Sequence, residues 1–527
     1  MSNVARSAAD HAAPNESPGA APRLRDMRDL PGPRGWPVLG NLPQIKPAQM
    51  HLQLRRWAHE YGRYYQLRMG SQRVLVVADH EAVAAVLRDR PEGFRRTQRM
   101  EDIGLEMGLT PGLFSANGEA WKRQRRMVMA AFDPGHVQAY YPALARCGER
   151  LAGRWTRAAE QGRVIDLQAD LMRFTVDAIA GLAFGTDVNT LQSEDDVIQK
   201  HLNRIFPKLY TRIISAVPYW RFFKLPSDRE LDRALVAVNA AIDGFIAGAR
   251  QRLAADPARR SAPQSLLEAM LVAANDPGSG IDDAQVAGNV LTMLLAGEDT
   301  TANTLAWCIW LLHRHPSALA RASAEARGVM AEVGEGVAAG NAEDRAGVTL
   351  AHLARLDFIE ACMNETMRLK PVGPFLPLQA LKDTVVGYIA VPAGTIVINL
   401  LRHDSVDDNF VPEASAFKPE RWLGMQGGAA PPAASTKRIS MPFGAGPRIC
   451  PGRYLALQEM KLVLVTLLTR FEIQAVGTED GGEPAERLMF AMAPVGLRMR
   501  LGMRPQNPAA PDPLPWRAGL TKDRSSP

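Results

Sequence analysis

Ten residues near the C-terminal end of the chain read Phe443-Gly444-Ala445-Gly446-Pro447-Arg448-Ile449-Cys450-Pro451-Gly452. The glycines in this loop permit positive φ angles and a close approach of backbone to a flat group. A helical pattern follows over residues 453–470, so the loop precedes a helix N-terminus, which favours negative charge. Backbone amides near Cys450 can donate to its sulfur. Both effects favour the thiolate, the form of cysteine that binds metal.

A single cysteine limits which metal this loop can hold. The chain has four cysteines, at 147, 308, 362 and 450, with no Cys-x-x-Cys pair. Zinc and iron–sulfur clusters need about four protein ligands. A lone thiolate suits the axial position of haem iron instead. The alternative interpretation is a glycine-rich turn around a buried cysteine.

At every fixed position the loop resembles the haem-binding signature of the cytochrome P-450 monooxygenases, F-G-x-G-x-R-x-C-x-G. The resemblance implies a mainly α-helical fold with a smaller β-rich region. It places haem b between a long central helix and the helix after the cysteine loop. Cys450 is then the axial ligand of the iron. Phe443 and Arg448 belong to the cofactor site, where Arg448 contacts a haem propionate.

The longest helical pattern spans residues 282–314, with Asp282 as N-cap and Pro316 ending it. At about 1.5 Å per residue it would run roughly 50 Å. Its middle reads Ala296-Gly297-Glu298-Asp299-Thr300-Thr301, and such polar choices in an apolar helix mark functional sites.

This segment is similar to the family's oxygen-activation motif, A-G-x-D/E-T-T. The resemblance implies that Ala296 and Gly297 leave room for a ligand on the iron. Thr300 then hydrogen-bonds dioxygen, Asp299 relays protons, and Thr301 is structural. The alternative is a helix kink with a solvent-facing acid.

Glu365 and Arg368 are three residues apart on a helical pattern and can form an ion pair. Downstream, Phe417-Lys418-Pro419-Glu420-Arg421 resembles the family's P-E-R-F box, with Trp422 in place of phenylalanine. The resemblance implies that Arg421 joins Glu365 and Arg368 in a buried network. Because an unpaired buried charge is very unfavourable, each of these side chains needs the others. Their expected role is to hold the fold, not to perform chemistry.

Trp121 and Arg125 match the family's W-x-x-x-R pair, which donates to a haem propionate. Two positions depart from the family pattern. Gln379 stands where an arginine is common, and Arg402-His403-Asp404 replaces the usual His-Arg-Asp order. Which of Gln379, Arg402 and His403 contacts a propionate is left open.

The ends of the chain differ in composition from the region between them. We expect residues 1–29 to be a disordered tail, 30–503 to form one haem domain, and 504–527 to be a proline-rich tail. Residues 1–29 contain several charged side chains and no apolar run, so we expect no signal peptide. No run of about 18 uncharged apolar residues occurs, so we expect no membrane anchor. Together with the cysteine spacing, this predicts a cytoplasmic protein. The net charge of +6 over 527 residues is small, which predicts no nucleic-acid partner.

A basic cluster predicts how electrons arrive. Lys122, Arg123, Arg125 and Arg126 would lie on the cysteine side of the haem in the resembled fold, where acidic electron carriers dock. We expect no reductase domain after residue 503. We therefore expect a separate ferredoxin or flavodoxin with its reductase, which uses NAD(P)H.

Together these motifs predict a haem-thiolate monooxygenase that uses O2 to hydroxylate or epoxidise an apolar small molecule. By family position Phe375, Leu376, Phe490 and Met492 make the pocket apolar. Two alternatives stay open. One is a peroxide-driven or isomerising haem-thiolate enzyme, and the other is a haem sensor or carrier without turnover.

Overall fold

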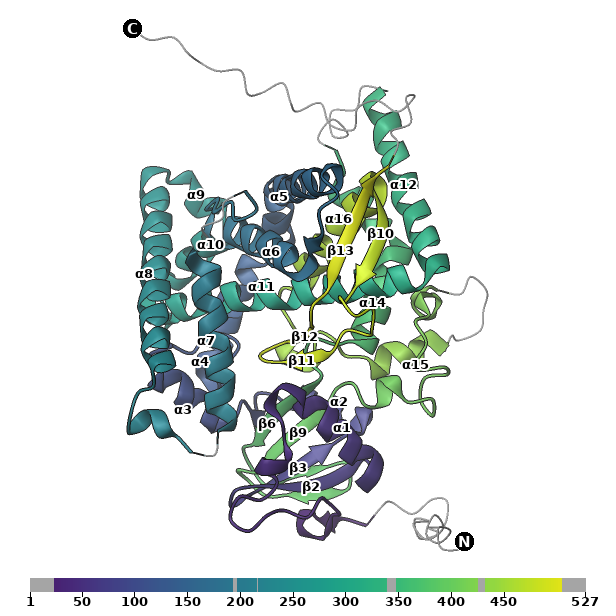
Figure 1. Ribbon diagram of the computed structural model, residues 1–527. Coiled ribbons are helices and arrows are strands. Elements are labelled where there is room, and N and C mark those ends of the chain that lie inside the picture. Colours follow the sequence, from purple (N-terminus) through teal and green to yellow (C-terminus); the bar gives the residue numbers. More distant parts are fainter. Residues whose placement is uncertain (1–22, 193–196, 216, 339–346, 425–431, 505–527) are drawn as a thin grey trace, which may run out of the picture.

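A computed structural model describes residues 23–192, 197–215, 217–338, 347–424 and 432–504. Helix α11 (Asp283–Arg314) crosses the middle of the molecule (Figure 1). Asp282 caps it: the Asp282 carboxylate accepts from the Gln285 amide at 2.7 Å, and the Gln285 side chain accepts from the Asp282 amide. This confirms the helix predicted over residues 282–314.

Helices dominate the described chain. The α-helices around α11 are α1 (Met50–Tyr61), α2 (His80–Arg88), α3 (Gln98–Glu106), α4 (Gly118–Ala131), α5 (Pro134–Glu160), α6 (Leu167–Phe184), α7 (Val197–Ile214), α8 (Pro226–Ala255), α9 (Ala258–Ser261), α10 (Leu266–Ala274), α12 (Pro316–Ala338), α13 (Leu350–Ala354), α14 (Asp357–Leu369), α15 (Pro432–Ile439) and α16 (Arg453–Arg470). The bounds of α16 are those expected from the sequence.

The strands form small sheets. They are β1 (Arg25–Asp26), β2 (Tyr64–Met69), β3 (Gln72–Val77), β4 (Phe94–Arg95), β5 (Ile165–Asp166), β6 (Phe375–Ala380), β7 (Thr384–Val386), β8 (Ile389–Val391), β9 (Ile396–Leu400), β10 (Phe471–Gly477), β11 (Glu486–Leu488), β12 (Met492–Pro494) and β13 (Arg498–Met503). The mainly helical fold with a smaller β-rich part is therefore as predicted.

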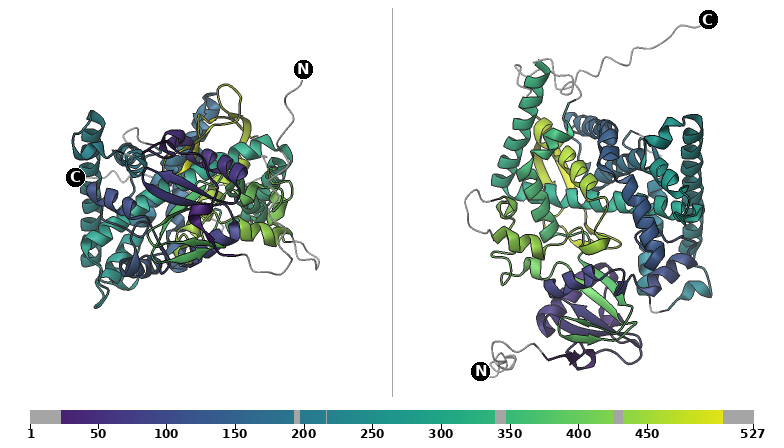
Figure 2. Two further views of the ribbon diagram at one scale, coloured as in Figure 1. Left: turned by 90° about the horizontal axis from the view of Figure 1, so that it is seen from below. Right: turned by 180° about the vertical axis from the view of Figure 1, so that it is seen from behind.

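The largest sheet joins segments that are far apart in sequence. Its order is β2-β3-β9-β6-β4, with β3 parallel to β9 and the other pairs antiparallel. Strands β2 and β3 form the expected hairpin, which turns at Gly70 with φ of 64°. Figure 2 shows from behind that this purple and green sheet lies at one end of the molecule, away from the long helices.

Regular structure begins before residue 30. Strand β1 pairs in parallel with β8, with Arg25 opposite Ile389, and a 3₁₀ turn follows it. Met27 and Leu30 are buried in the core beneath this sheet. The prediction of a disordered tail through residue 29 is therefore wrong for residues 25–29. Residues 1–22 and 505–527 lie outside the described part of the chain.

The core forms around α11, which packs against both α6 and α16. Gly297 makes the first of these contacts possible, because a Cβ there would lie 2.8 Å from Cγ1 of Ile179 on α6. The small residue therefore serves helix packing, a role that the sequence did not predict. Among the described helices, none is both long and apolar enough to cross a membrane.

Candidate active site

The cysteine loop is fixed by its own backbone and by helix α2. The Cys450 amide donates to the Phe443 carbonyl oxygen at 3.0 Å, which closes the loop just before α16 begins. Gly446 has φ of 71°, and a Cβ there would lie 2.7 Å from the Leu87 carbonyl oxygen. Glycine is therefore required at this position by both conformation and space.

The Cys450 sulfur lies in a site where opposing effects act on its charge. Burial raises the pKa of the Cys450 thiol, whereas the Gly452 amide and the Arg125 and Arg453 guanidinium groups lower it. The sequence-based expectation of a thiolate included the amide but left out burial, which is the larger effect. Coordination to a metal deprotonates such a thiol outright.

Four buried or half-buried arginines form what we call the arginine cluster. Arg90 follows α2, Arg96 follows β4, Arg125 lies on α4, and Arg448 lies in the cysteine loop. Burial lowers the pKa of Arg448 to about 9 and that of Arg90 to about 10, and it also lowers the pKa values of the other two. Within the described residues, none of the four forms an ion pair with a carboxylate. Because buried charge is very unfavourable without a partner, the cluster fits a ligand that carries carboxylates.

Aromatic rings and backbone carbonyls hold this cluster in place. The Arg448 guanidinium lies 4.9 Å from the centre of the Trp121 ring and donates to the Ala116 carbonyl at 2.6 Å. The Arg96 guanidinium lies 4.1 Å from the centre of the Phe114 ring. The structure thus brings Trp121, Arg125 and Arg448 together as predicted, and it adds Arg96.

Arg90 and Arg96 were missed at the level of sequence because neither belongs to a motif. Arg90 donates to the Ala445 carbonyl in the cysteine loop at 3.4 Å. Arg96 directly follows strand β4, so the sheet that contains β4 positions it in the site. A buried arginine after a short strand carries no distinguishing local pattern.

The three residues left open for a propionate contact have hydrogen-bond or ring partners outside the arginine cluster. Gln379 accepts from the Gln98 amide at 2.9 Å and lines a cleft of about 240 Å³ with Arg99 and Arg221. Arg402 donates to Glu486 at 2.7 Å, and the His403 ring lies 4.7 Å from that of His59. In the described chain none of the three hydrogen-bonds to the arginine cluster, and Gln379 pairs in the sheet with Arg95, the neighbour of Arg96.

Asp299 and Thr300 lie on α11, apart from the loop. Burial raises the pKa of the Asp299 carboxyl to about 6. The Thr300 hydroxyl donates to the Ala296 carbonyl at 2.7 Å, which leaves its oxygen able to accept. Within the described chain, neither side chain hydrogen-bonds to residues 443–452. A carboxyl with this pKa can take up and release a proton near neutral pH.

Thr301 connects this helix to the one that follows the cysteine loop. Its hydroxyl hydrogen-bonds the buried carboxyl of Glu459 on α16, whose pKa burial raises to about 8. A carboxyl that is protonated near neutral pH can occupy the core without a cation. Thr301 therefore has a structural contact. Its partner Glu459 could not be predicted from the sequence.

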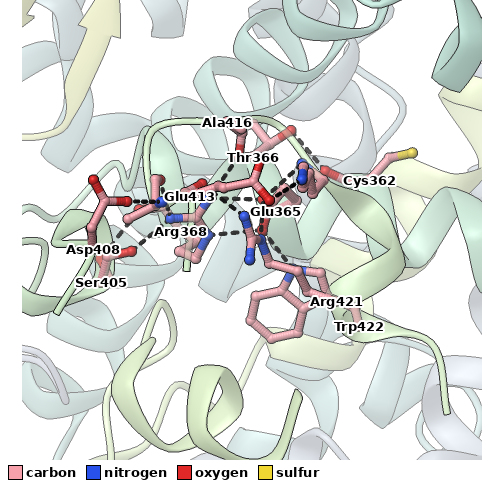
Figure 3. A network of polar contacts seen from close by, with 12 residues as sticks. Cys362, Glu365, Thr366, Arg368, Ser405, Asp408, Glu413, Ala416, Arg421 and Trp422 are labelled. Carbon is pink, nitrogen blue, oxygen red and sulfur yellow. Dashed lines mark hydrogen bonds and ion pairs between the residues drawn. The ribbon is translucent and has the colours of Figure 1, made fainter. Parts of the chain in front are cut away.

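A second polar network surrounds Glu365, which is 0% exposed (Figure 3). Arg368 donates to both of its oxygens, at 2.8 and 2.7 Å, and Arg421 donates at 3.2 Å. Arg368 also donates to the Ser405 and Ala414 carbonyls, both at 2.6 Å. The predicted network of Glu365, Arg368 and Arg421 is present, and its bonds tie α14 to the segment before the cysteine loop.

The sequence of this chain places it in a family. A sequence model described as Cytochrome P450 matches residues 30–501, so the chain belongs to the cytochrome P450 family. It is an oxidoreductase of the monooxygenase class, whose family cofactor is haem and whose co-substrate is O2.

Similar proteins come from plants and fungi. Cytochrome P450 97B2, chloroplastic, from Glycine max is 27% identical over 84% of this chain and 81% of its own length. Protein LUTEIN DEFICIENT 5, chloroplastic, from Arabidopsis thaliana is 25% identical over 82% of this chain and 71% of its own length. Self-sufficient cytochrome P450 monooxygenase CYP505E4 from Penicillium freii is 27% identical over 91% of this chain but only 44% of its own length.

The residues described above fit haem. Cys450 offers one sulfur ligand, and Gly446 holds the loop backbone close to α2. The arginine cluster supplies cations without carboxylate partners, as the two propionates require.

Proposed function

We propose that this protein inserts one oxygen atom from O2 into an apolar small molecule by hydroxylation or epoxidation, with electrons from a separate carrier protein. The observation that carries the proposal is the arginine cluster, which has no carboxylate partner among the described residues, beside the half-buried Cys450. This combination suits an anionic, metal-containing cofactor better than any soluble substrate.

These residues would have two roles, to hold the cofactor and to transfer protons. Cys450 would bind the iron through its sulfur, and Phe443 would close the loop around it. The propionates would be held by Trp121 and by the arginine cluster of Arg90, Arg96, Arg125 and Arg448. When bound, haem would supply the iron centre at which dioxygen is activated. Asp299 would take protons from solvent and pass them to the Thr300 hydroxyl, which presents them at the oxygen site. An acid with a pKa of about 6 can both accept and release protons there.

The substrate we propose is apolar. Phe490 lies with its ring centre 5.3 Å from that of Phe114, and Met492 is fully buried beside it. Phe375 and Leu376 on β6 are half-buried against the core. We propose that these four uncharged side chains line the substrate pocket.

We propose a ferredoxin or flavodoxin with an NAD(P)H-dependent reductase as the electron source. On α4, Lys122 is already paired with Glu119 at 2.8 Å and Glu92 at 2.9 Å, so Arg123 and Arg126 are the cations left for an acidic partner. The self-sufficient relatives make a fused reductase the alternative arrangement for electron supply. The described cysteines are all free, which fits a reducing compartment such as the cytoplasm.

Labelled oxygen tests this proposal. Haem-loaded protein receives ¹⁸O2, a plant-type ferredoxin with its reductase, and apolar compounds chosen by their spin-state shift. We expect one ¹⁸O atom in the product and product formed in step with reductant. Thr300→Ala should consume reductant with little product. The control, Thr304→Ala, removes a hydroxyl with the same type of bond one turn further along α11 and should keep its coupling.

Other outcomes identify the alternatives. A product labelled only by H2¹⁸O2 would indicate a peroxide-driven enzyme, and an unlabelled rearranged product would indicate an isomerising one. Haem binding without any product would favour a sensor or carrier.

A further inference from the structure

The 110–117 segment, which lies directly before α4, carries carbonyl groups that hold two members of the arginine cluster. Arg448 donates to the Leu113 carbonyl oxygen at 3.2 Å and to the Ala116 carbonyl oxygen at 2.6 Å. Arg96 donates to the carbonyl that follows that of Leu113, at 3.1 Å. The side chains of a binding site keep their geometry through hydrogen bonds to the residues behind them. The position of this segment therefore determines where both guanidinium groups lie.

This segment packs against the central helix α11 with backbone close to backbone. A Cβ on Gly288 would lie 2.6 Å from the Thr110 carbonyl oxygen, and a Cβ on Gly112 would overlap the Gly288 carbonyl group. Glycine at both positions permits this close approach, because any larger residue would force the two backbones apart. Helix α11 thus supports the segment that holds the arginines.

Two buried amide side chains fasten the segment to the helices on either side of it. Asn289 on α11 is 0% exposed, and its Oδ1 accepts from the Leu113 amide at 2.9 Å. Its Nδ2 donates to Gln124 Oε1 at 2.9 Å and to the Gln285 carbonyl at 2.7 Å. Gln124 on α4 in turn donates to the Pro111 carbonyl at 3.0 Å. The oxygen and the nitrogen of both amides therefore have partners, as buried polar groups require.

We propose that Asn289 and Gln124 are positioning residues of the cofactor site, which fix the 110–117 segment and thereby keep Arg96 and Arg448 in place for the haem propionates. This inference rests on the proposed function, because it takes the arginine cluster as the site of the propionates. Both residues act through the segment, since their own hydrogen-bonding atoms are already engaged with protein groups. A shift of the segment would move two guanidinium groups at once.

The alternative is that this amide pair only stabilises the fold, and a second buried asparagine on α11 distinguishes the two roles. Asn303 is 4% exposed, donates to the Asp299 carbonyl at 2.8 Å and accepts from Gln168 at 2.9 Å. Its side chain thus links α11 to α6 instead of to the 110–117 segment. Asn303→Leu is therefore matched to Asn289→Leu in burial and in the kind of bonds that it removes.

Hydrogen exchange of the haem-loaded proteins tests the contact itself. In the wild type the Leu113 amide should be protected, because Asn289 accepts its hydrogen bond. Asn289→Leu should accelerate exchange in peptides that cover the 110–117 segment by roughly tenfold, the scale of one lost buried hydrogen bond. Asn303→Leu should leave exchange in these peptides unchanged. Equal exchange in the three proteins would overturn the proposal.

Haem transfer to apomyoglobin tests whether the pair acts through the arginines. Asn289→Leu should accelerate transfer by roughly three- to tenfold, which is the effect of one or two misplaced hydrogen bonds, and Asn303→Leu should not. In an Arg448→Gln background Asn289→Leu should accelerate transfer by a smaller factor, because the group through which it acts is gone. The full factor in that background, or an equal acceleration in Asn303→Leu, would show a merely structural role.

Gln124→Met repeats both measurements from the other helix and decides the outcome where Asn289→Leu fails to fold. It keeps the length of the side chain and removes the bonds to Asn289 and Pro111, so it should accelerate exchange and haem transfer in the same way. Wild-type rates in this variant would overturn the inference and leave the proposed function intact. A wild-type protein that retains no haem would contradict the proposed function, and this inference with it.

Discussion

The indole Nε1–H of Trp422 donates to Oε2 of Glu365 at 2.9 Å. The same carboxylate accepts from Arg368, from Arg421 and from the Lys418 amide at 2.9 Å. A phenylalanine, which stands at this position in the family pattern, cannot donate. The tryptophan therefore adds a hydrogen bond to a carboxylate that is fully removed from water.

Trp422→Phe should destabilise the fold because it removes a donor from a buried charge. We expect the free energy of unfolding to fall by about 1.5–3 kcal/mol, the usual range for a hydrogen bond to a charged group. Urea denaturation followed by circular dichroism measures it. Trp36→Phe, at a position 59% exposed, is the control and should change stability little. Equal stabilities for the two variants would show that the indole bond is unimportant.

Gly297→Ala should force α6 and α11 apart. The new Cβ would lie 2.8 Å from Ile179 Cγ1, and such overpacking costs about 1–3 kcal/mol. Gly244→Ala is the control, because no atom lies within 4 Å of its Cβ position and the helix gains roughly 0.5–1 kcal/mol. In an Ile179→Ala background, Gly297→Ala should lower the free energy of unfolding by a smaller amount. Equal costs in both backgrounds would rule out the contact as the cause.

The sequence predicted those parts of the fold that local patterns determine. The cap at Asp282, the bounds of α16 and the hairpin at Gly70 all follow from neighbouring residues. The pairing of β1 with β8 could not be predicted, because each strand is only two or three residues long and the two are far apart in the chain.

The site shows the same division. Trp121, Arg125, Arg448 and Cys450 belong to motifs, and the structure brings them together. Arg96, Glu459 and Trp422 act through tertiary contacts, and no local periodicity distinguishes them. The contact of Gly297 with Ile179 could not be predicted, because sequence does not show which helix face meets a neighbour.

Arg96→Gln and Arg125→Gln should weaken haem retention. Each removes a cation from a cluster without carboxylates, so haem transfer to apomyoglobin should accelerate by roughly tenfold or more per residue. The haem-free variants should be as stable as wild type or more so, because repulsion among the arginines falls. Arg126→Gln, an exposed neighbour on α4, should leave the rate of haem transfer unchanged. A similar acceleration for Arg126→Gln would contradict a specific role of the cluster.

Asp299 should make stability depend on pH. Its folded-state pKa of about 6 lies above the ordinary value of 3.8. Between these values the unfolded chain has released the proton while the folded protein keeps it, so stability falls as pH rises from about 4 to 6. The fall should be roughly 2–3 kcal/mol in the wild type relative to Asp299→Asn.

Urea denaturation of both proteins at several pH values measures this difference. It should reach a plateau above about pH 7. A difference that stays constant from pH 4 to 7 would show that the carboxyl is not desolvated.

The central claim is that Cys450 supplies a thiolate to haem iron. The absorption spectrum of the dithionite-reduced, haem-loaded protein under carbon monoxide tests it, for wild type, Cys450→Ala and the control Cys147→Ala. We predict a strongly red-shifted Soret band in wild type and Cys147→Ala that is lost only in Cys450→Ala. Bound haem without this band in the wild type, or a band that survives in Cys450→Ala, would contradict the assignment.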